Sequence, residues 1–246
     1  MTIDLKDIRN RLLNSLPEAT LQRLVPHLSS VTLLGGMTID HVDGPITRMY
    51  FINTGLVSLV KVMHDGRTVE VGAVGAEGVT DPTALFGIDS AIVESMVQIP
   101  GKALCIDREV LIAEMANDPE LARAMQRYTR FAIGQLAQTA ACNRLHTLEE
   151  RCCRWILTGR DNVEDETFTL THEFLGMMLG APRSSVSLTA KVLQKAGLID
   201  YARGSLTVVD RGGLEQTACE CYFDTQNELV RLLQSGAGPE QKQGVR

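Results

Sequence analysis

The chain has 246 residues, of which 44% are hydrophobic, so it is long and apolar enough for two domains with sizeable cores. Its net charge of −6 excludes a histone-like basic protein, and any DNA affinity must come from a local patch. No stretch approaches the ~20 apolar residues of a membrane span, the N-terminal residues lack the apolar core of a signal peptide, and six cysteines without framework spacing suit a reducing compartment. We therefore expect a cytoplasmic protein with no membrane partner.

The first hundred residues change character once. Residues 1–28 are predicted to form short helices, because apolar residues such as Leu12, Leu13 and Leu24 recur at helical spacing. Residues 29–107 instead contain short apolar runs between many glycines, for example 49–52 and 56–62. Asp65-Gly66 is typical of a hairpin turn. This stretch predicts an antiparallel β-sandwich or β-roll.

A long helix is predicted from residue 118 onward. Along it, residues recur at alternating steps of four and three, which is a heptad-like seam: Leu121, Met125, Tyr128, Ala132, Gln135, Thr139 and Cys142. A helix with one such stripe packs either on its own domain or on a twin helix. We favour the twin, because the seam mixes small and polar residues as dimer helices often do.

Three further segments follow the same logic. A helix is predicted over 147–158, with Leu148, Cys152 and Trp155 on one face. The acidic run 161–166 is predicted to be a solvated loop, and residues 211–233 to be one C-terminal helix. Residues 235–246 have almost no apolar side chains and are predicted to lack a packed structure.

Residues 168–210 predict a winged helix-turn-helix. Thr171 is placed as a helix N-cap, Gly180 ends that helix, and Pro182 opens a second helix that stops at Gly197. Residues 198–209 then read as two short strands around a glycine turn. Two helices at a tight turn followed by a hairpin are the layout of a recognition helix and a wing.

The charge of this segment supports a DNA-facing role. No Asp or Glu occurs from Phe174 to Ile199, whereas Arg183, Lys191 and Lys195 do. A surface that meets phosphates should exclude acids and contain Lys or Arg. The alternative is a small helical subdomain with an ordinary solvated face.

The order of these segments resembles the Crp/Fnr family of bacterial transcription regulators. The resemblance covers about residues 8–215 and includes Tyr50-Phe51-Ile52 followed by Gly55-Leu56-Val57, then Asp65-Gly66-Arg67, the strand from Pro100-Gly101 to Ile106, and the block from Leu170 to Val209. It implies an α+β protein with a jelly-roll-like sensor domain, a long dimerisation helix and a winged helix-turn-helix. It also implies a homodimer that binds palindromic promoter DNA and contacts RNA polymerase.

The resemblance assigns DNA contacts to two regions. The recognition helix supplies candidates for base contacts, and its neighbours and the wing supply candidates for phosphate contacts. Arg183 matches the family position that typically reads guanine. The DNA-binding candidates are Arg183, Ser184, Ser185, Ser187, Leu188, Lys191, Thr171, His172, Arg203 and Ser205.

The sensor region departs from the cyclic-nucleotide-binding members. Those hold the phosphate with a Gly-Glu-Leu turn and an Arg-Ser pair, where this chain has residues 80–86 and Ala91-Ile92. Between Thr68 and Asp107 there is no Arg, and Lys102 stands against six acids. A cyclic phosphate needs charged donors, so we expect no cyclic nucleotide, no cofactor and an effector of unknown class. The N-terminal cysteine cluster of iron–sulfur members is also missing, since the first cysteine is Cys105.

The remaining cysteines leave a second function open. Cys219 and Cys221, or Cys152 and Cys153, could form a thiol- or metal-responsive switch. On one continuous helix, however, Cys219 and Cys221 would point about 200° apart. We therefore predict buried structural cysteines and no metal site.

An enzyme is the distant alternative. A cupin-like metalloenzyme would need clustered histidines, whereas the roll offers only His41 and His64, far apart in the sequence. We expect no catalytic activity. The domain prediction is a cyclic-nucleotide-binding-like sensor over 1–115, a dimerisation helix over 116–145, a DNA-binding domain over 146–215, and a C-terminal helix with a flexible tail over 216–246.

Overall fold

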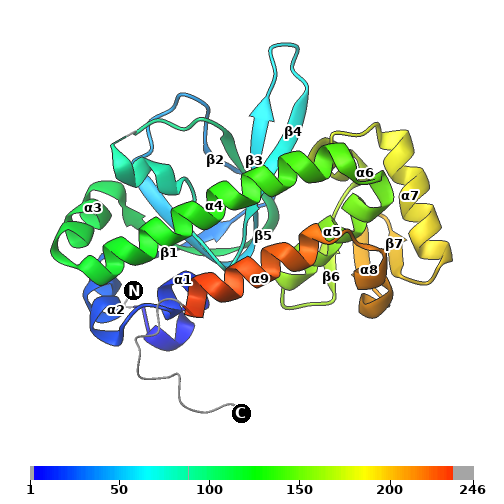
Figure 1. The fold of residues 1–246 in the computed structure, drawn as a ribbon. Coiled ribbons are helices and arrows are strands. Elements are labelled where there is room, and N and C mark those ends of the chain that lie inside the picture. The colour runs from blue at the N-terminus through cyan, green and yellow to red at the C-terminus, as the bar shows by residue number, and fades with distance from the viewer. Residues whose placement is uncertain (1–2, 88, 235–246) are drawn as a thin grey trace.

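The computed structural model describes residues 3–87 and 89–234 and has the predicted α+β architecture (Figure 1). A β-roll is followed by a long helix and then by a small domain with a three-stranded sheet. Four short helices precede the roll: η1 (Leu5–Asp7), α1 (Arg11–Asn14), α2 (Glu18–Leu24) and η2 (Val25–His27). Among the described residues, no helix combines the length and apolar composition that a bilayer span requires.

The roll is an antiparallel sheet in the order β1-β5-β3-β4, with β2 paired to β5. Its strands are β1 (Ser29–Leu33), β2 (Thr38–Asp40), β3 (Arg48–Val62), β4 (Thr68–Val74) and β5 (Glu94–Asp107). The runs predicted at 49–52 and 56–62 belong to one strand, β3, which stays paired with β5 across several register shifts. Such bulges bend a strand and let the sheet curl. The predicted turn is present, with Gly66 at φ +82°.

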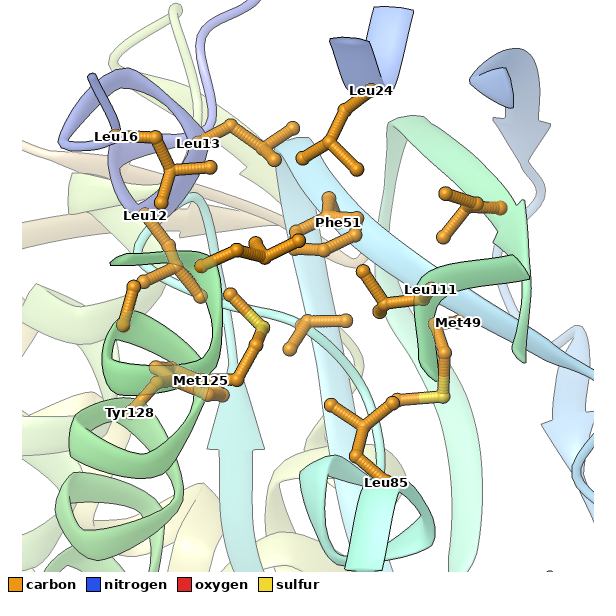
Figure 2. Packing of buried hydrophobic residues seen from close by; sticks show 14 of the residues in the cluster. Leu12, Leu13, Leu16, Leu24, Met49, Phe51, Leu85, Leu111, Met125 and Tyr128 are labelled. Atoms are coloured by element: carbon orange, nitrogen blue, oxygen red, sulfur yellow. The ribbon is translucent and has the colours of Figure 1, made fainter. Parts of the chain in front are cut away.

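The interior of the roll is filled by the chain itself. The short helix η3 (Pro82–Phe86) contributes Leu85, and the long helix contributes Met125 and Tyr128, to a cluster with Phe51 (Figure 2). A Cβ on Gly78 would overlap the Tyr128 hydroxyl, so the aromatic ring lies directly against that backbone. The side chain of Tyr128 is fully buried.

Two helices connect the roll to the second domain. Helix α3 (Arg108–Asn117) was not predicted, and it spans the end of the predicted sensor domain and the start of the predicted dimerisation helix. Its apolar residues are consecutive and give no amphipathic stripe. Helix α4 (Pro119–Leu145) is the predicted long helix. Asp118 caps it by accepting hydrogen bonds from the backbone N–H groups of Glu120 and Leu121.

The predicted dimer seam faces inward over its first half. Leu121, Met125 and Tyr128 are buried in the core of the same chain, so the prediction that they face a twin helix is wrong. Thr139 is also buried, Gln135 and Thr139 line an internal cavity, and Ala132 is half-buried. The stripe packs on its own domain because the roll and the C-terminal helix together cover it.

The second domain contains α5 (Leu148–Asp161), β6 (Thr167–Thr169), α6 (His172–Leu179), α7 (Arg183–Lys195), β7 (Ile199–Ala202) and β8 (Ser205–Val208). Its sheet has the order β6-β8-β7. Helix α5 begins with a capping box between Thr147 and Glu150. In the loop after α5, Glu164, Asp165 and Glu166 are exposed as predicted, whereas Asn162 and Val163 are half-buried. Asp161, the last residue of α5, pairs with Arg211.

The C-terminal segment is two helices and not one. Helix α8 (Arg211–Thr217) ends before Cys219, and α9 (Cys221–Gln234) begins at Cys221. Helix α9 runs antiparallel to α4 (Figure 1): Cys221 lies near Cys142, whereas Leu229 and Leu232 join the cluster of Tyr128. The tail predicted over 235–246 lies outside the described residues.

Candidate DNA-binding interface

The turn between α6 and α7 follows from a few residues with special backbone roles. Thr171 caps α6 by accepting a hydrogen bond from the Phe174 N–H at 3.2 Å. Gly180 ends α6 at φ +58°, a left-handed conformation that glycine adopts without steric cost. Pro182 was predicted to be the first residue of the second helix. It is the N-cap residue of α7, and the helix itself begins at Arg183.

Helix α7 has one buried face and one exposed face. Val186, Ala190 and Leu193 are buried in the cluster around Trp155, Phe168 and Leu175, which fixes the helix on its domain. The opposite face exposes the predicted base-reading candidates Arg183, Ser184, Leu188 and Lys191.

Two apolar side chains stand on this exposed face. Leu188 is 65% exposed, and Val192, one turn further along, is 45% exposed. Val192 was missed as a candidate, although its i,i+4 spacing from Leu188 is visible in the sequence. Two exposed apolar side chains among Arg and Lys suit a surface that meets both thymine methyl groups and phosphates.

His172 and Ser187 bond each other. Their Nδ1 and Oγ atoms are 2.9 Å apart, and the imidazole stacks on the Tyr201 ring at a centroid distance of 4.3 Å. Burial, together with the charges of Arg183 and Lys191, lowers the pKa of His172. The His172 Nε2 atom is itself buried, so the geometry does not favour the direct DNA contacts predicted for these two side chains.

The wing is a two-residue hairpin. Arg203 at φ +51° and Gly204 at φ +80° form its turn, and two positive φ angles in succession match the twist of flanking strands. Arg203 is exposed at the tip, while Ser205 begins β8 and is half-buried. The Tyr201 hydroxyl donates to the Leu170 carbonyl at 2.7 Å and thereby ties the wing to the start of α6.

The second domain is packed onto the roll of the same chain. Leu56, Val60 and Ile99 of the roll share one hydrophobic cluster with Trp155 and Leu179. A Cβ on Gly180 would lie 3.1 Å from the Val69 Cγ2 atom, so the α6–α7 turn rests on β4.

A buried carboxyl group joins the two domains. Glu70 Oε2 accepts from the Trp155 Nε1–H at 3.3 Å and from the Ser58 hydroxyl at 2.5 Å. Burial raises the pKa of Glu70 to about 7 despite these donors. A cavity of about 120 Å³ borders this contact. Arg11 and Arg154 are among the residues that line it.

The region that matches the phosphate turn of cyclic-nucleotide binders contains carboxyl groups. Asp81, at φ +42°, precedes η3 and accepts from the Ser95 hydroxyl at 3.1 Å. Burial and the neighbouring Asp81 carboxylate raise the pKa of Asp40 to about 7. Ala91 is buried and its N–H donates to the Gly44 carbonyl, while Ile92 is 58% exposed.

Cys152 and Cys153 are fully buried, and burial raises the pKa of Cys153 to about 12 and that of Cys152 further. A neutral buried thiol is a poor nucleophile and a poor metal ligand. The structure therefore gives these two cysteines a packing role, as predicted. The histidines of the metalloenzyme alternative, His41 and His64, are both exposed on separate turns.

The sequence matches one family model, the Crp-like helix-turn-helix domain, over residues 150–217. The matched residues contain nearly all of α5 and the elements from β6 to α8, and therefore the α6–α7 turn, α7 and the wing. No relative among the curated proteins matches the chain.

Solved structures extend the likeness to the whole fold. FixK2 from Bradyrhizobium japonicum is 18% identical with a TM-score of 0.67, over 78% of this chain and 98% of that one. A putative Crp/Fnr-family regulator from Eubacterium rectale is 16% identical with a TM-score of 0.64, over 84% and 96%. A CRP-family regulator from Thermus thermophilus is 20% identical with a TM-score of 0.64, over 76% and 96%. The chain thus has the fold of Crp/Fnr transcription regulators around its Crp-like domain.

Proposed function

We propose that this chain is a non-enzymatic transcription regulator that binds a palindromic DNA site as a homodimer, and that the exposed face of α7 reads the bases. The observation that supports it best is this face itself. In a chain of net charge −6, the segment from Phe174 to Ile199 has no acid, and α7 exposes Arg183 and Lys191. A local basic surface within an acidic protein is what site-directed DNA binding requires.

The roles divide by position. Arg183 at the start of α7, with Ser184, Ser185, Leu188 and Val192, is assigned to base edges in the major groove. Thr171, Arg203 and Ser205, from the start of α6 and the wing, are assigned to phosphates, and Lys191 to either. Ser187 and His172 orient α7 through their mutual bond and the stack on Tyr201.

The homodimer would use the outer face of α4. Ile133 is 56% exposed there, and Phe86 of η3 is 47% exposed beside it across one shallow depression. Exposed residues recur along α4 at alternating steps of four and three: Gln126, Arg130, Ile133, Ala137, Ala140 and Arg144. This stripe, and not the buried seam, has the spacing of a two-helix interface.

The sensor domain is proposed not to bind a cyclic nucleotide. The carboxyl groups of Asp40 and Asp81 lie near the phosphate turn and supply none of the cationic donors that a cyclic phosphate needs. Contact with RNA polymerase rests on the family resemblance and stays a prediction.

Selection of bound fragments from random DNA tests the core of the proposal. The wild-type protein should enrich a two-fold symmetric motif with half-sites one helical turn, ~34 Å, apart. A pool that remains random after repeated rounds, with folded protein, would contradict it.

Sedimentation tests the interface. The wild-type chain should sediment at twice 26.9 kDa, and Ile133→Glu should sediment as a monomer. Ile92→Glu is the matched control, because Ile92 is equally exposed but lies on the roll. A monomeric wild type at micromolar concentration, or a dimeric Ile133→Glu variant, would refute this interface.

Calorimetry tests the sensor. Titration with cAMP or cGMP should give no binding at micromolar concentration. Micromolar affinity that also strengthens DNA binding would overturn the argument from Asp40 and Asp81.

A further inference from the structure

Three cysteines and a histidine from three segments meet at one end of the long helix. Cys142 lies in the last turn of α4, His146 is the C-cap residue of that helix, and Cys219 and Cys221 flank the start of α9. Their ligand atoms all lie within 4.8 Å of one another. The expectation that Cys219 and Cys221 diverge is wrong, because the chain leaves the helix at Ala218 and only resumes it at Cys221.

The spacing within this group, the Cys3His cluster, is that of one tetrahedral ion. The Sγ atoms of Cys142 and Cys219 are 3.6 Å apart, and Cys221 Sγ is 3.5 Å from His146 Nδ1. A tetrahedral zinc ion with Zn–S bonds of about 2.3 Å and a Zn–N bond of about 2.0 Å would hold neighbouring ligand atoms roughly 3.5–3.8 Å apart. A multi-iron cluster would need its ligands farther apart.

The surroundings also have the character of a metal site. The His146 Nε2 atom, which faces away from the sulfurs, lies 3.1 Å from the Glu220 carboxylate. A carboxylate on the far nitrogen of a ligating histidine fixes its tautomer and raises its basicity. The Gln138 side-chain N–H donates to Cys221 Sγ at 3.0 Å, a contact suited to a thiolate.

We propose that Cys142, His146, Cys219 and Cys221 bind one zinc ion that pins α9 to the hinge between the long helix and the DNA-binding domain. On binding, the three thiols become thiolates and their protons pass to solvent. All four positions are taken by protein atoms, which is the mark of a structural and not a catalytic zinc. The site does not depend on the proposed DNA-binding function.

The position of the ion gives it a mechanical role. Helix α9 packs antiparallel on α4 and contacts α5, while His146 lies between α4 and α5. The ion would join the C-terminal end of α4 to the N-terminal end of α9 by coordination bonds, in addition to the packing between the two helices. Loss of the ion should therefore release the N-terminal end of α9 first.

Metal content is the first test. The protein purified without chelator should contain one zinc per chain, and Cys142→Ser and Cys219→Ser should lose it. Cys105→Ser is the matched control, because Cys105 is equally buried but lies on strand β5, outside the cluster. The Cys105 Sγ atom is 3.1 Å from the Ser29 hydroxyl, a contact that a serine can keep.

Cobalt exchanged into the wild type should give the thiolate charge-transfer absorption of a tetrahedral site, with none in Cys219→Ser. Less than a tenth of an equivalent of zinc after incubation with zinc salt, a Cys142–Cys219 disulfide in fresh protein, or stoichiometric iron would each overturn the assignment.

The second test is amide hydrogen exchange, which measures whether the ion stabilises the start of α9. Zinc removal with a strong chelator, or Cys219→Ser, should speed exchange at least about tenfold in residues 221–228, with little change in β3 and β5. Unchanged exchange in α9 after complete zinc loss would refute the pinning role.

Glu220→Gln should weaken zinc affinity by about 10–100-fold if its carboxylate orients His146. If the zinc-loaded protein then failed to select DNA, the proposed function would fail while the zinc site stood.

Discussion

The exposed face of α7 and the interior of the roll place charge in opposite ways. On α7, Arg183 and Lys191 are exposed and no acid lies within the helix. In the roll, Asp40, Asp81 and Glu70 are buried, and burial raises the pKa of each of them. The exposed face of α7 offers cationic groups to an anion, whereas these buried carboxyl groups offer none. This contrast separates the architecture, which the chain shares with solved Crp/Fnr structures, from the chemistry of the groups inside its roll.

Removal of the ring that fills the roll gives the largest expected effect. Tyr128→Ala should lower the free energy of unfolding by about 3–5 kcal/mol, the range for buried aromatic side chains, as measured by urea denaturation. Tyr128→Phe is the control, because it keeps the ring and loses only the hydroxyl that accepts from Val79 N–H. The Ala variant should still not bind cAMP, since Asp40 and Asp81 remain. Tight cAMP binding by that variant would mean that the ring alone blocks the nucleotide.

The second-largest effect is expected from Glu70→Gln, which replaces the buried carboxyl group between the two domains with a neutral amide. The pKa of Glu70 is raised from 4.5 to about 7 in the folded state, so its stabilising contribution is complete below about pH 4.5 and is lost as pH rises through 7. The wild type should therefore lose roughly 3 kcal/mol of stability between pH 5 and pH 8 relative to Glu70→Gln. Urea denaturation across this pH range measures the difference. Parallel pH profiles for the two proteins would show that Glu70 stays ionised.

On the DNA-facing side, Arg183→Ala should cost about 1–3 kcal/mol on the preferred site and relax one base position. Its guanidinium is the strongest candidate for bidentate contact with guanine. The comparison of selected motifs between the two proteins measures this. An unchanged motif with a folded variant would mean that Arg183 is not a base reader.

The smallest expected effect concerns the wing. Arg203→Ala should weaken binding to all sequences alike, by roughly 1 kcal/mol or less, and reduce the salt slope by about one per protomer. Affinity titrations at several salt concentrations measure the slope. Loss of discrimination at a single base pair, with an unchanged slope, would reassign Arg203 to base reading.

Local signals predicted the recognition unit well. Thr171, Gly180 and the Arg203–Gly204 turn each set the backbone through their own chemistry, so a single sequence is enough to place them. The exposed face of α7 follows from the helical period. Val192 could have been added by the same reasoning.

Features that depend on packing partners were not predictable. The stripe from Leu121 to Tyr128 is equally suited to a twin helix or to the chain's own roll, and only the tertiary structure decides between them. The cysteine cluster was missed because the break at Ala218–Glu220 contains neither glycine nor proline. A continuous helix was therefore predicted there, and on such a helix Cys219 and Cys221 would lie on opposite faces.

The contact between Val69 and the α6–α7 turn affects which spacing between two DNA half-sites a dimer would accept. Because each recognition helix rests on the roll of its own chain, it cannot slide independently to fit a longer or shorter site. The distance between two half-sites would then depend on how the two α4 helices cross, although α4 already ends at Leu145 and α7 begins only at Arg183. A regulator built this way changes its spacing preference by repacking a helix pair that never touches the nucleic acid.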